Sequence, residues 1–265
     1  MELPSYEIFA IKYAERKARH ADRFMGGDPH DAAISMDYFL WLVRDGQRVI
    51  LVDTGFDAEM AAKRKRTLVR EPHDGLRMLG VNTEDVHEII VTHLHNDHVG
   101  TFFDFPNAKF HIQDEELSYA TGRYMNNSTL NRSYEVDHIV GVVRMVFDNK
   151  VVFHKGDEEI APGLHVHHIG GHTAGLQAVR VHTKRGWVVL ASDASHFYEN
   201  FEKRRCYPNV FHVGQMADGY EKLYRLADSP RHIIPGHDPL VMRRYPPPSP
   251  DLKEMIVRLD VEPCE

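Results

Sequence analysis

The stretch His93-Leu94-His95-Asn96-Asp97-His98 decides what this chain can be. It directly follows residues 88–92, whose apolar centre predicts a short strand. In an extended segment residues two apart face the same way, so the first two histidines can present their imidazoles to one ion. The aspartate and the last histidine lie where the chain must turn, and they can face a second ion nearby. Imidazole and carboxylate suit zinc and related divalent metals, so the hexapeptide predicts a dinuclear metal site.

Further ligands must come from elsewhere, because zinc centres take at least three protein donors per ion. His172 lies in a glycine-rich turn, Asp193 follows the apolar residues 187–192, and His237 follows the short apolar residues 231–235. Each is expected just past a strand end, where functional side chains gather on loops held by a rigid scaffold. Most of the 19 histidines are expected to be solvated or hydrogen-bonded. Three strand histidines remain alternatives to His172, namely His165, His167 and His168.

Apolar periodicity and turn residues predict a mixed α/β (α+β) chain that forms a single domain over residues 1–265. A long loop, rich in Gly, Asp and Pro, is expected at residues 21–36. Helices are expected at residues 57–68, 72–79, 114–120, 134–147 and 215–227. Strands are expected at residues 6–13, 38–43, 48–52, 88–92, 108–112, 151–154, 164–169, 178–183, 187–192 and 231–235.

Composition narrows the classes of partner. The net charge of -7 disfavours nucleic acid and anionic membranes, which bind proteins through excess Lys and Arg. The first residues lack the basic and apolar regions of a secretory signal, and no apolar run approaches the roughly 20 residues that span a bilayer. The two cysteines suit a reducing compartment. We therefore expect a cytoplasmic protein that binds neither nucleic acid nor membrane.

With these residues in place, the chain resembles the metallo-β-lactamase superfamily, and within it the quorum-quenching N-acyl-homoserine lactonases. The resemblance runs from Asp53-Thr54-Gly55 through the histidine motif to Pro235-Gly236-His237-Asp238. It implies an αββα sandwich of two mixed sheets flanked by helices, and it makes a homodimer plausible. It also implies a ligand set, with one ion on His93, His95 and His172, the other on Asp97, His98 and His237, and Asp193 bridging.

The same resemblance implies roles for further residues. Asp53 would orient a ligand histidine, although an Asp before Thr-Gly is also a common turn former. Asp97 would be both a ligand and the group that carries a proton to the leaving oxygen. Where these lactonases usually have a tyrosine donor three residues after the bridging Asp, this chain has His196, with Tyr198 as a nearby substitute. Phe102 and Met36 are candidates for a pocket that takes an acyl chain.

These features predict a lactone hydrolase in which two metal ions, zinc first, generate a hydroxide that attacks the ring carbonyl. Manganese, iron or cobalt remain alternatives. N-acyl-homoserine lactones are the leading substrates, and the histidine at position 196 weakens that assignment. The main alternative is a catabolic lactonase acting on a ring lactone from aromatic or pyridine compound breakdown. A glyoxalase-II-like thioesterase fits less well because only a short segment follows His237. A noncatalytic metal-binding module is the remaining alternative.

Overall fold

The computed structural model describes residues 3–27 and 31–264, and within them the strands form two sheets. The first sheet has the order β13-β1-β2-β3-β5-β6-β7, with β4 paired to β1. Its strands β1 to β3 pair antiparallel, and β3, β5, β6 and β7 pair parallel. Their bounds are β1 (Glu7–Arg19), β2 (Ala33–Arg44), β3 (Val49–Val52), β4 (Thr67–Leu68), β5 (Glu88–Ile90), β6 (Lys109–Gln113), β7 (Val151–His154) and β13 (Ile256–Arg258).

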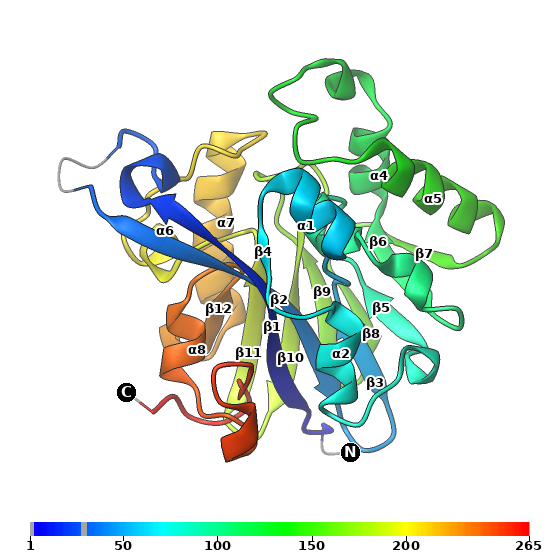
Figure 1. Cartoon of the computed structure of the whole chain (residues 1–265), viewed down its shortest axis with the longest axis vertical. Helices are drawn as coiled ribbons and strands as arrows, with labels where there is room; N and C mark the ends of the chain where they lie inside the picture. Colours follow the sequence, from blue (N-terminus) through cyan, green and yellow to red (C-terminus); the bar gives the residue numbers. More distant parts are fainter. Residues whose placement is uncertain (1–2, 28–30, 265) are drawn as a thin grey trace.

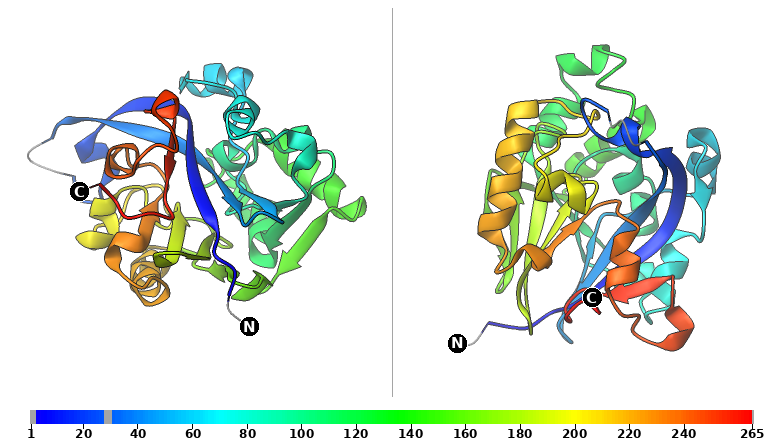
Figure 2. Two further views of the ribbon diagram at one scale, coloured as in Figure 1. Left: turned by 90° about the horizontal axis from the view of Figure 1, so that it is seen from below. Right: turned by 90° about the vertical axis from the view of Figure 1, so that its left-hand side faces the viewer.

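The second sheet has the order β12-β11-β10-β9-β8. It is also mixed, because β11 and β12 are parallel while its other pairs are antiparallel. Its strands are β8 (Glu158–Ala161), β9 (Leu164–His168), β10 (Gln177–Thr183), β11 (Gly186–Ser192) and β12 (Ile233–Pro235). The two sheets stack with helices on their outer faces (Figures 1 and 2).

The helices complete the four layers. In the right-hand view of Figure 2, α7 covers the second sheet, and α1 and α2 lie beyond the first sheet on the opposite side. The helices are α1 (Ala58–Arg64), α2 (Pro72–Arg77), α3 (Asn96–Val99), α4 (Asp114–Ala120), α5 (Val136–Phe147), α6 (Tyr198–Glu202), α7 (Val213–Leu226) and α8 (Leu240–Arg244). The expected αββα sandwich is confirmed. No helix among the described residues is long and apolar enough to cross a membrane.

Alternation along β2 shows how the sequence builds this sandwich. Phe39, Trp41 and Val43 belong to the apolar core that includes the second sheet. Leu40 and Leu42 belong to the other core, which includes residues of α2 and α5. Successive side chains of a strand point to opposite faces, so β2 is apolar along its inner part because both of its faces are covered.

Several sequence predictions are wrong in their details. Residues 21–36 are not one long loop, since β1 continues to Arg19, a 3-10 helix η1 follows (His20–Arg23), and β2 already begins at Ala33; residues 28–30 lie outside the described part. The outer halves of β1 and β2 pair from Ala14↔Tyr38 to Arg19↔Ala33 and form a hairpin. This hairpin was not predicted because its side chains are largely polar and lack the apolar pattern of a strand. Helix α1 ends at Arg64, with Lys65 in the left-handed region at φ 53°. The strands β4, β8 and β13 and the short helices α6 and α8 were not predicted, because each is too short to show periodicity.

Candidate metal centre

The predicted ligands gather where strands of both sheets end. The motif from His93 to His98 follows β5 and enters α3, and Asp193 directly follows β11. His172 lies in the loop after β9, and His237 lies two residues after β12. Because β5 is parallel to β3, and β11 to β12, their carboxyl ends lie at the same edge of each sheet. The sandwich thus brings segments far apart in sequence into one site.

The first cluster contains His93, His95, His172 and Asp193, whose donor atoms all lie within 4.8 Å of one another. His95 Nδ1 is 2.9 Å from His93 Nε2 and 3.0 Å from His172 Nε2. All three rings are buried. Three imidazole nitrogens and one carboxylate oxygen converge on a single point, which is the donor set of a zinc-type site.

The second cluster contains Asp97, His98 and His237. The Asp97 Oδ2 atom is 3.8 Å from the Nε2 atoms of both histidines. Asp193 joins the two clusters, because its Oδ1 lies 3.0 Å from His237 Nε2 while its Oδ2 lies 3.2 Å from His172 Nε2. One carboxylate therefore faces both clusters, one oxygen to each, as the predicted bridging role requires.

Hydrogen bonds to the far side of the rings fix which nitrogen faces the cluster. The Nδ1–H of His98 donates to Asp53 Oδ2 at 2.7 Å, as predicted for Asp53. His172 Nδ1 donates to the Asn209 carbonyl at 2.7 Å, and His237 Nδ1 donates to the Asp37 carbonyl at 2.9 Å. Because Nδ1 of each ring is held by these acceptors, Nε2 is the atom that points into the clusters and is available to an ion.

The electrostatics of the clusters fit divalent cations. Burial, followed by the neighbouring histidines, holds the pKa of His93 and His95 well below the usual value, so both rings are neutral donors. His98 Nε2 is buried without a hydrogen-bond partner among the described residues, and Asp193 Oδ1 forms no well-aligned hydrogen bond there although it lies 3.0 Å from His237 Nε2. Buried polar atoms are rarely left unpaired, and both of these are candidate metal-ligand atoms at the second cluster. The residues therefore fit two divalent ions.

Glu116 on α4 is a supporting residue that the sequence reasoning missed. Its buried carboxylate accepts hydrogen bonds from Leu94 N (2.9 Å), Tyr134 OH (3.0 Å), Thr173 Oγ1 (2.6 Å) and Gly175 N (3.0 Å). Because Leu94 lies between two ligands and Thr173 follows a third, this carboxylate ties the two ligand loops together. No local signal distinguishes it from the other acidic residues of its helix.

The clusters lie at a cavity of about 320 Å³, lined by parts of β1, β2, α1 and the ligand loops. His196 and Met36 line it, as predicted. His196 Nε2 is 3.0 Å from Asp193 Oδ2, and its ring stacks on Tyr207 with centroids 3.6 Å apart. Burial lowers the pKa of His196 to about 3, although Asp193 acts against this, so the ring is neutral.

Two predicted site residues lie elsewhere. Tyr198 is buried on α6 beneath Arg244, whose guanidinium is 3.8 Å from the ring centroid, so it does not take the place of His196. Phe102 is core, in contact with Phe103 under α5, and not a wall of the cavity. The strand histidines 165 and 167 pack near each other on β9, where His167 pairs with Asp157, and His168 pairs with Glu115. Of these four candidates, His172 is the one that lies in the first cluster among the described residues.

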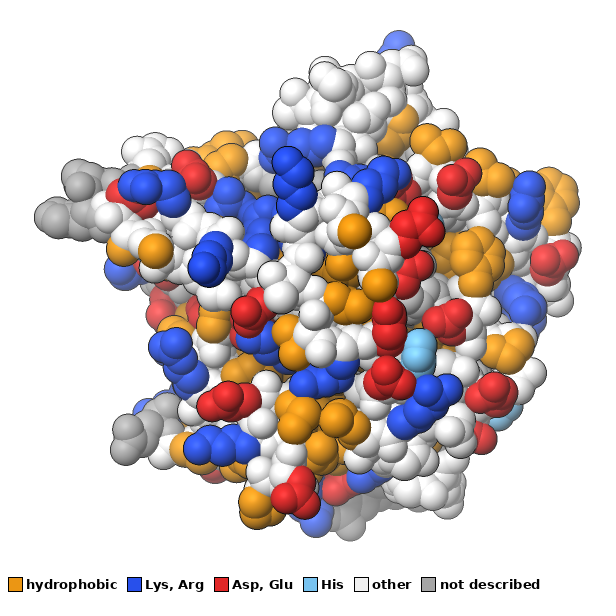
Figure 3. Space-filling model, in the orientation of Figure 1, with side chains coloured by type: hydrophobic (Ala, Val, Ile, Leu, Met, Phe, Trp, Pro, Cys, Tyr) orange, Lys and Arg blue, Asp and Glu red, His pale blue; other side chains and the backbone are white. Residues whose placement is uncertain are grey.

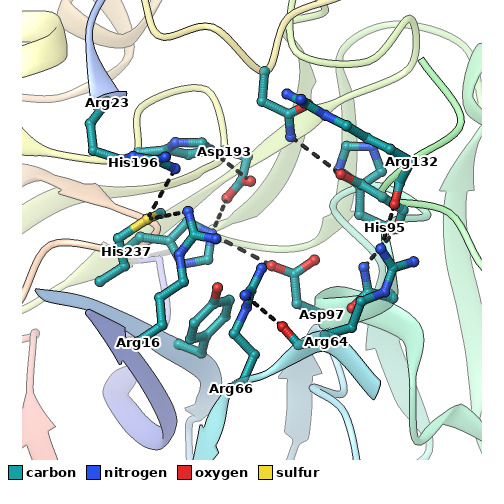
Figure 4. Close-up of a pocket in the computed structure, with 15 residues that line it drawn as sticks. Arg16, Arg23, Arg64, Arg66, His95, Asp97, Arg132, Asp193, His196 and His237 are labelled. Carbon is teal, nitrogen blue, oxygen red and sulfur yellow. Dashed lines mark hydrogen bonds and ion pairs between the residues drawn. The ribbon is translucent and has the colours of Figure 1, made fainter. Parts of the chain in front are cut away.

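Arginines are the unexpected part of the lining. Figure 4 shows them on several sides of Asp97 and Asp193, and the five that line the cavity are Arg16, Arg23, Arg64, Arg66 and Arg132. In the space-filling view, Lys and Arg side chains gather in the upper middle of the face, near α1 and the outer ends of β1 and β2 (Figure 3). The run Lys63-Arg64-Lys65-Arg66 was the available sequence signal.

Comparison with known proteins identifies several lactonases that are similar to this chain in sequence. An N-acyl homoserine lactonase of Bacillus cereus is 32% identical over 128 residues, which is 48% of this chain and 46% of the relative. The chain thus matches about half the length of such relatives. The lactonase AiiB of Agrobacterium fabrum is 26% identical over 178 residues, 61% of this chain and 64% of that protein.

Solved structures agree at the level of the fold. A quorum-quenching N-acyl homoserine lactone lactonase superposes with a TM-score of 0.76 at 23% identity, covering 91% of this chain and 95% of that one. The dizinc quorum-quenching lactonase AidC gives a TM-score of 0.67 at 18% identity, covering 90% of each chain. The family model for the metallo-beta-lactamase superfamily matches residues 38–244. This range holds every candidate ligand, and the chain belongs to the metallo-beta-lactamase superfamily.

Proposed function

We propose that this chain is a dinuclear metal-dependent hydrolase that opens a lactone ring. The observation that supports the proposal most is Asp193, whose two carboxylate oxygens face two separate clusters of buried histidines beside a cavity of about 320 Å³. Cavities of a few hundred Å³ are typical of small-molecule sites. A closed structural site would not need such a cavity, which disfavours the noncatalytic alternative.

In this proposal His93, His95 and His172 would hold one ion, Asp97, His98 and His237 would hold the other, and Asp193 would contribute to both sites. The chemistry that divalent ions, zinc first, would supply there when bound is activation of a water and polarisation of the substrate carbonyl. No protein nucleophile is then required.

The chain's own residues position the substrate and move the proton. Asp97 lines the cavity, and its backbone carbonyl accepts a hydrogen bond from Tyr13 OH at 2.8 Å, which fixes the aspartate at the start of α3. Its carboxylate would carry the proton to the ring oxygen as the ester bond breaks. His196 would donate its Nε2–H, which faces Asp193 Oδ2 at 3.0 Å in this structure, to the carbonyl oxygen as negative charge develops there.

Two classes of lactone are candidates. The names of the curated relatives favour N-acyl homoserine lactones. The charged lining of the cavity favours an acyl-free ring lactone, such as one formed in the breakdown of aromatic or pyridine compounds, because an acyl chain requires apolar walls. Met36 and Tyr38 are the large apolar contributors among the described lining residues.

A panel of lactones, read by acid release from the zinc-loaded protein, tests the proposal. The panel pairs short- and long-chain N-acyl homoserine lactones with acyl-free lactones, and it adds an ester and a thioester. We expect turnover of at least one lactone class, and its loss in Asp193→Asn. A protein that binds about two metals per chain and hydrolyses no lactone would disprove the function.

A further inference from the structure

The outer half of the β1–β2 hairpin brings two basic groups to the metal site. Arg16 and Met36 are directly paired across β1 and β2, and Tyr38 lies two residues further along β2, on the same face. Arg23 ends η1, the 3-10 helix that follows β1. Arg66 approaches from the segment between α1 and β4. All line the cavity, and Figure 4 shows Arg16 and Arg66 side by side near Asp97.

The five lining arginines differ in their partners. Arg64 is ion-paired with Glu135 and donates to the carbonyls of Arg132 and Tyr134. Arg132 donates to Asn209 at 3.2 Å. These two side chains are thus used, at least in part, to hold the walls of the cavity.

Arg16, Arg23 and Arg66 have no acidic partner among the described residues. The nearest acceptor for Arg16 Nη2 and Arg23 Nη1 is the thioether of Met36, at 3.2 and 3.8 Å. Thioether sulfur is a weak acceptor. The Nε atoms of Arg16 and Arg23 are buried and unbonded in the described structure. Arg66 Nη1 donates to the Arg64 carbonyl at 2.7 Å, and its guanidinium lies 5.8 Å from the Tyr38 ring centroid, so its contacts include no negative charge among the described residues.

These cations also repel one another. Burial, followed by the charge of Arg16, lowers the pKa of Arg23, and Arg66 acts in the same direction. The carboxylates that line the cavity, Asp97 and Asp193, belong to the metal clusters. Two divalent ions would add positive charge to the same space. Partly buried cations without a counterion are costly, so the arrangement calls for an anion from outside the chain.

We propose that the substrate of this site is an anionic lactone, whose carboxylate or phosphate group is bound by Arg16, Arg23 and Arg66 while its ring lies at the metal clusters. This inference rests on the proposed lactone hydrolysis and specifies its substrate class. Guanidinium groups bind carboxylate and phosphate oxygens through paired N–H donors. The site would thus recognise a ring with a second, charged end, in place of an acyl chain.

Pairs of lactones that are similar in shape but differ in charge test whether the site prefers an anionic substrate. The first pair is γ-butyrolactone-γ-carboxylate and its γ-carboxamide, which have nearly the same shape and differ in charge. The second pair is γ-hydroxymethyl-γ-butyrolactone and its phosphate ester, which separates phosphate from carboxylate as the preferred group. For the zinc-loaded wild type we expect kcat/KM to favour the anionic member of at least one pair by on the order of tenfold or more.

Variants of the cavity arginines test whether the preference for an anionic lactone depends on these side chains. Arg16→Gln and Arg66→Gln should lower kcat/KM for the preferred anionic lactone by roughly 10- to 100-fold, mainly by raising KM. The kcat/KM for the neutral lactone of the same pair should not change. Arg225→Gln removes the same charge from an exposed position on α7 and should change neither. Equal turnover of the anionic and neutral members, or an equal loss for both in the arginine variants, would overturn the inference while lactone hydrolysis stands.

A binding measurement separates the inference from turnover. Glutarate has a carboxylate at each end, whereas pentanoate has the same length and one carboxylate. In calorimetric titrations of the zinc-loaded protein, glutarate should bind about tenfold tighter or more, and this advantage should disappear in Arg16→Gln. Equal affinity for the two acids would refute the arginine site. Absence of all lactone turnover with the glutarate preference intact would instead refute the proposed reaction.

Discussion

Asp53 allows a direct test of how the chain supports the metal clusters. Its fully buried carboxylate accepts three hydrogen bonds, from Thr92 N (2.7 Å), Thr92 Oγ1 (2.8 Å) and His98 Nδ1 (2.7 Å). The residue has φ 61°, in the left-handed region that Asn also tolerates. Asp53→Asn therefore keeps the shape and the backbone, and it removes the negative charge that faces His98.

The magnitude follows from these contacts. A hydrogen bond to a charged group contributes about 1.5–3 kcal/mol, and the new amide can place an N–H group against a donor. Loss of a partner that orients a ligand histidine typically lowers metal affinity roughly 10- to 100-fold. We expect a loss of this size at the second cluster, where His98 lies, and a smaller loss at the first cluster.

Metal affinity can be measured by competition with a chromophoric chelator, alongside unfolding in urea. The matched control is Asp260→Asn, which removes a buried carboxylate bonded to Ile8 N (3.3 Å) and Arg258 near the start of β1, away from the clusters. Both variants should be less stable, but only Asp53→Asn should bind metal more weakly. Wild-type affinity at both sites in Asp53→Asn would refute the orienting role.

Three further predictions concern the same region. Gly175→Ala would place a Cβ 2.1 Å from Glu116 N, so we expect a loss of about 3 kcal/mol or more in urea unfolding; an unchanged midpoint would contradict the packing. His196→Phe keeps the stacking on Tyr207 and removes the N–H, so kcat should fall roughly 10²–10³-fold with metal content retained, whereas normal turnover would exclude the donor role. Chelation should lower Tm, and zinc at 100 times its Kd should restore about 2.7 kcal/mol per site; a Tm insensitive to metal would argue against both clusters.

Much of the fold could be predicted because many of its strands and turns show a pattern within their own short segment of sequence. The alternating and continuous apolar runs of β2, β3, β10 and β11 show in sequence, and so do the turns that separate them. The ligand residues could be found because each follows such a strand. Their grouping came from the resemblance, and the geometry agrees with it through the two oxygens of Asp193.

The parts that were missed depend on contacts between distant segments. The pairing of Arg16 with Met36 is set by the register of the β1–β2 hairpin, and the approach of Arg66 to that hairpin is set by β4. Glu116 reaches Thr173 across 57 residues. Polar side chains on the outer hairpin lack the apolar pattern that indicates a strand, so residues 21–36 were interpreted as a loop and no role was predicted for the arginines near them.

One stretch of β2 links the geometry of the metal site to the shape of the cavity. The Asp37 carbonyl accepts from His237 Nδ1 at 2.9 Å, and the His237 carbonyl accepts from Asp37 N at 3.0 Å, so this backbone fixes a ligand. The side chains on either side, Met36 and Tyr38, lie on the opposite face of the strand from the Asp37 side chain and line the cavity, and the Tyr38 ring packs against His237 with centroids 4.9 Å apart. A shift of the hairpin by one residue would exchange these faces and misplace both functions. The Lys12–Asp37 ion pair at 3.0 Å and the bulge at Tyr13 hold the register at this point. Further out on the hairpin, Arg16 and Arg23 line the same cavity, where the proposed anionic end of the substrate would bind.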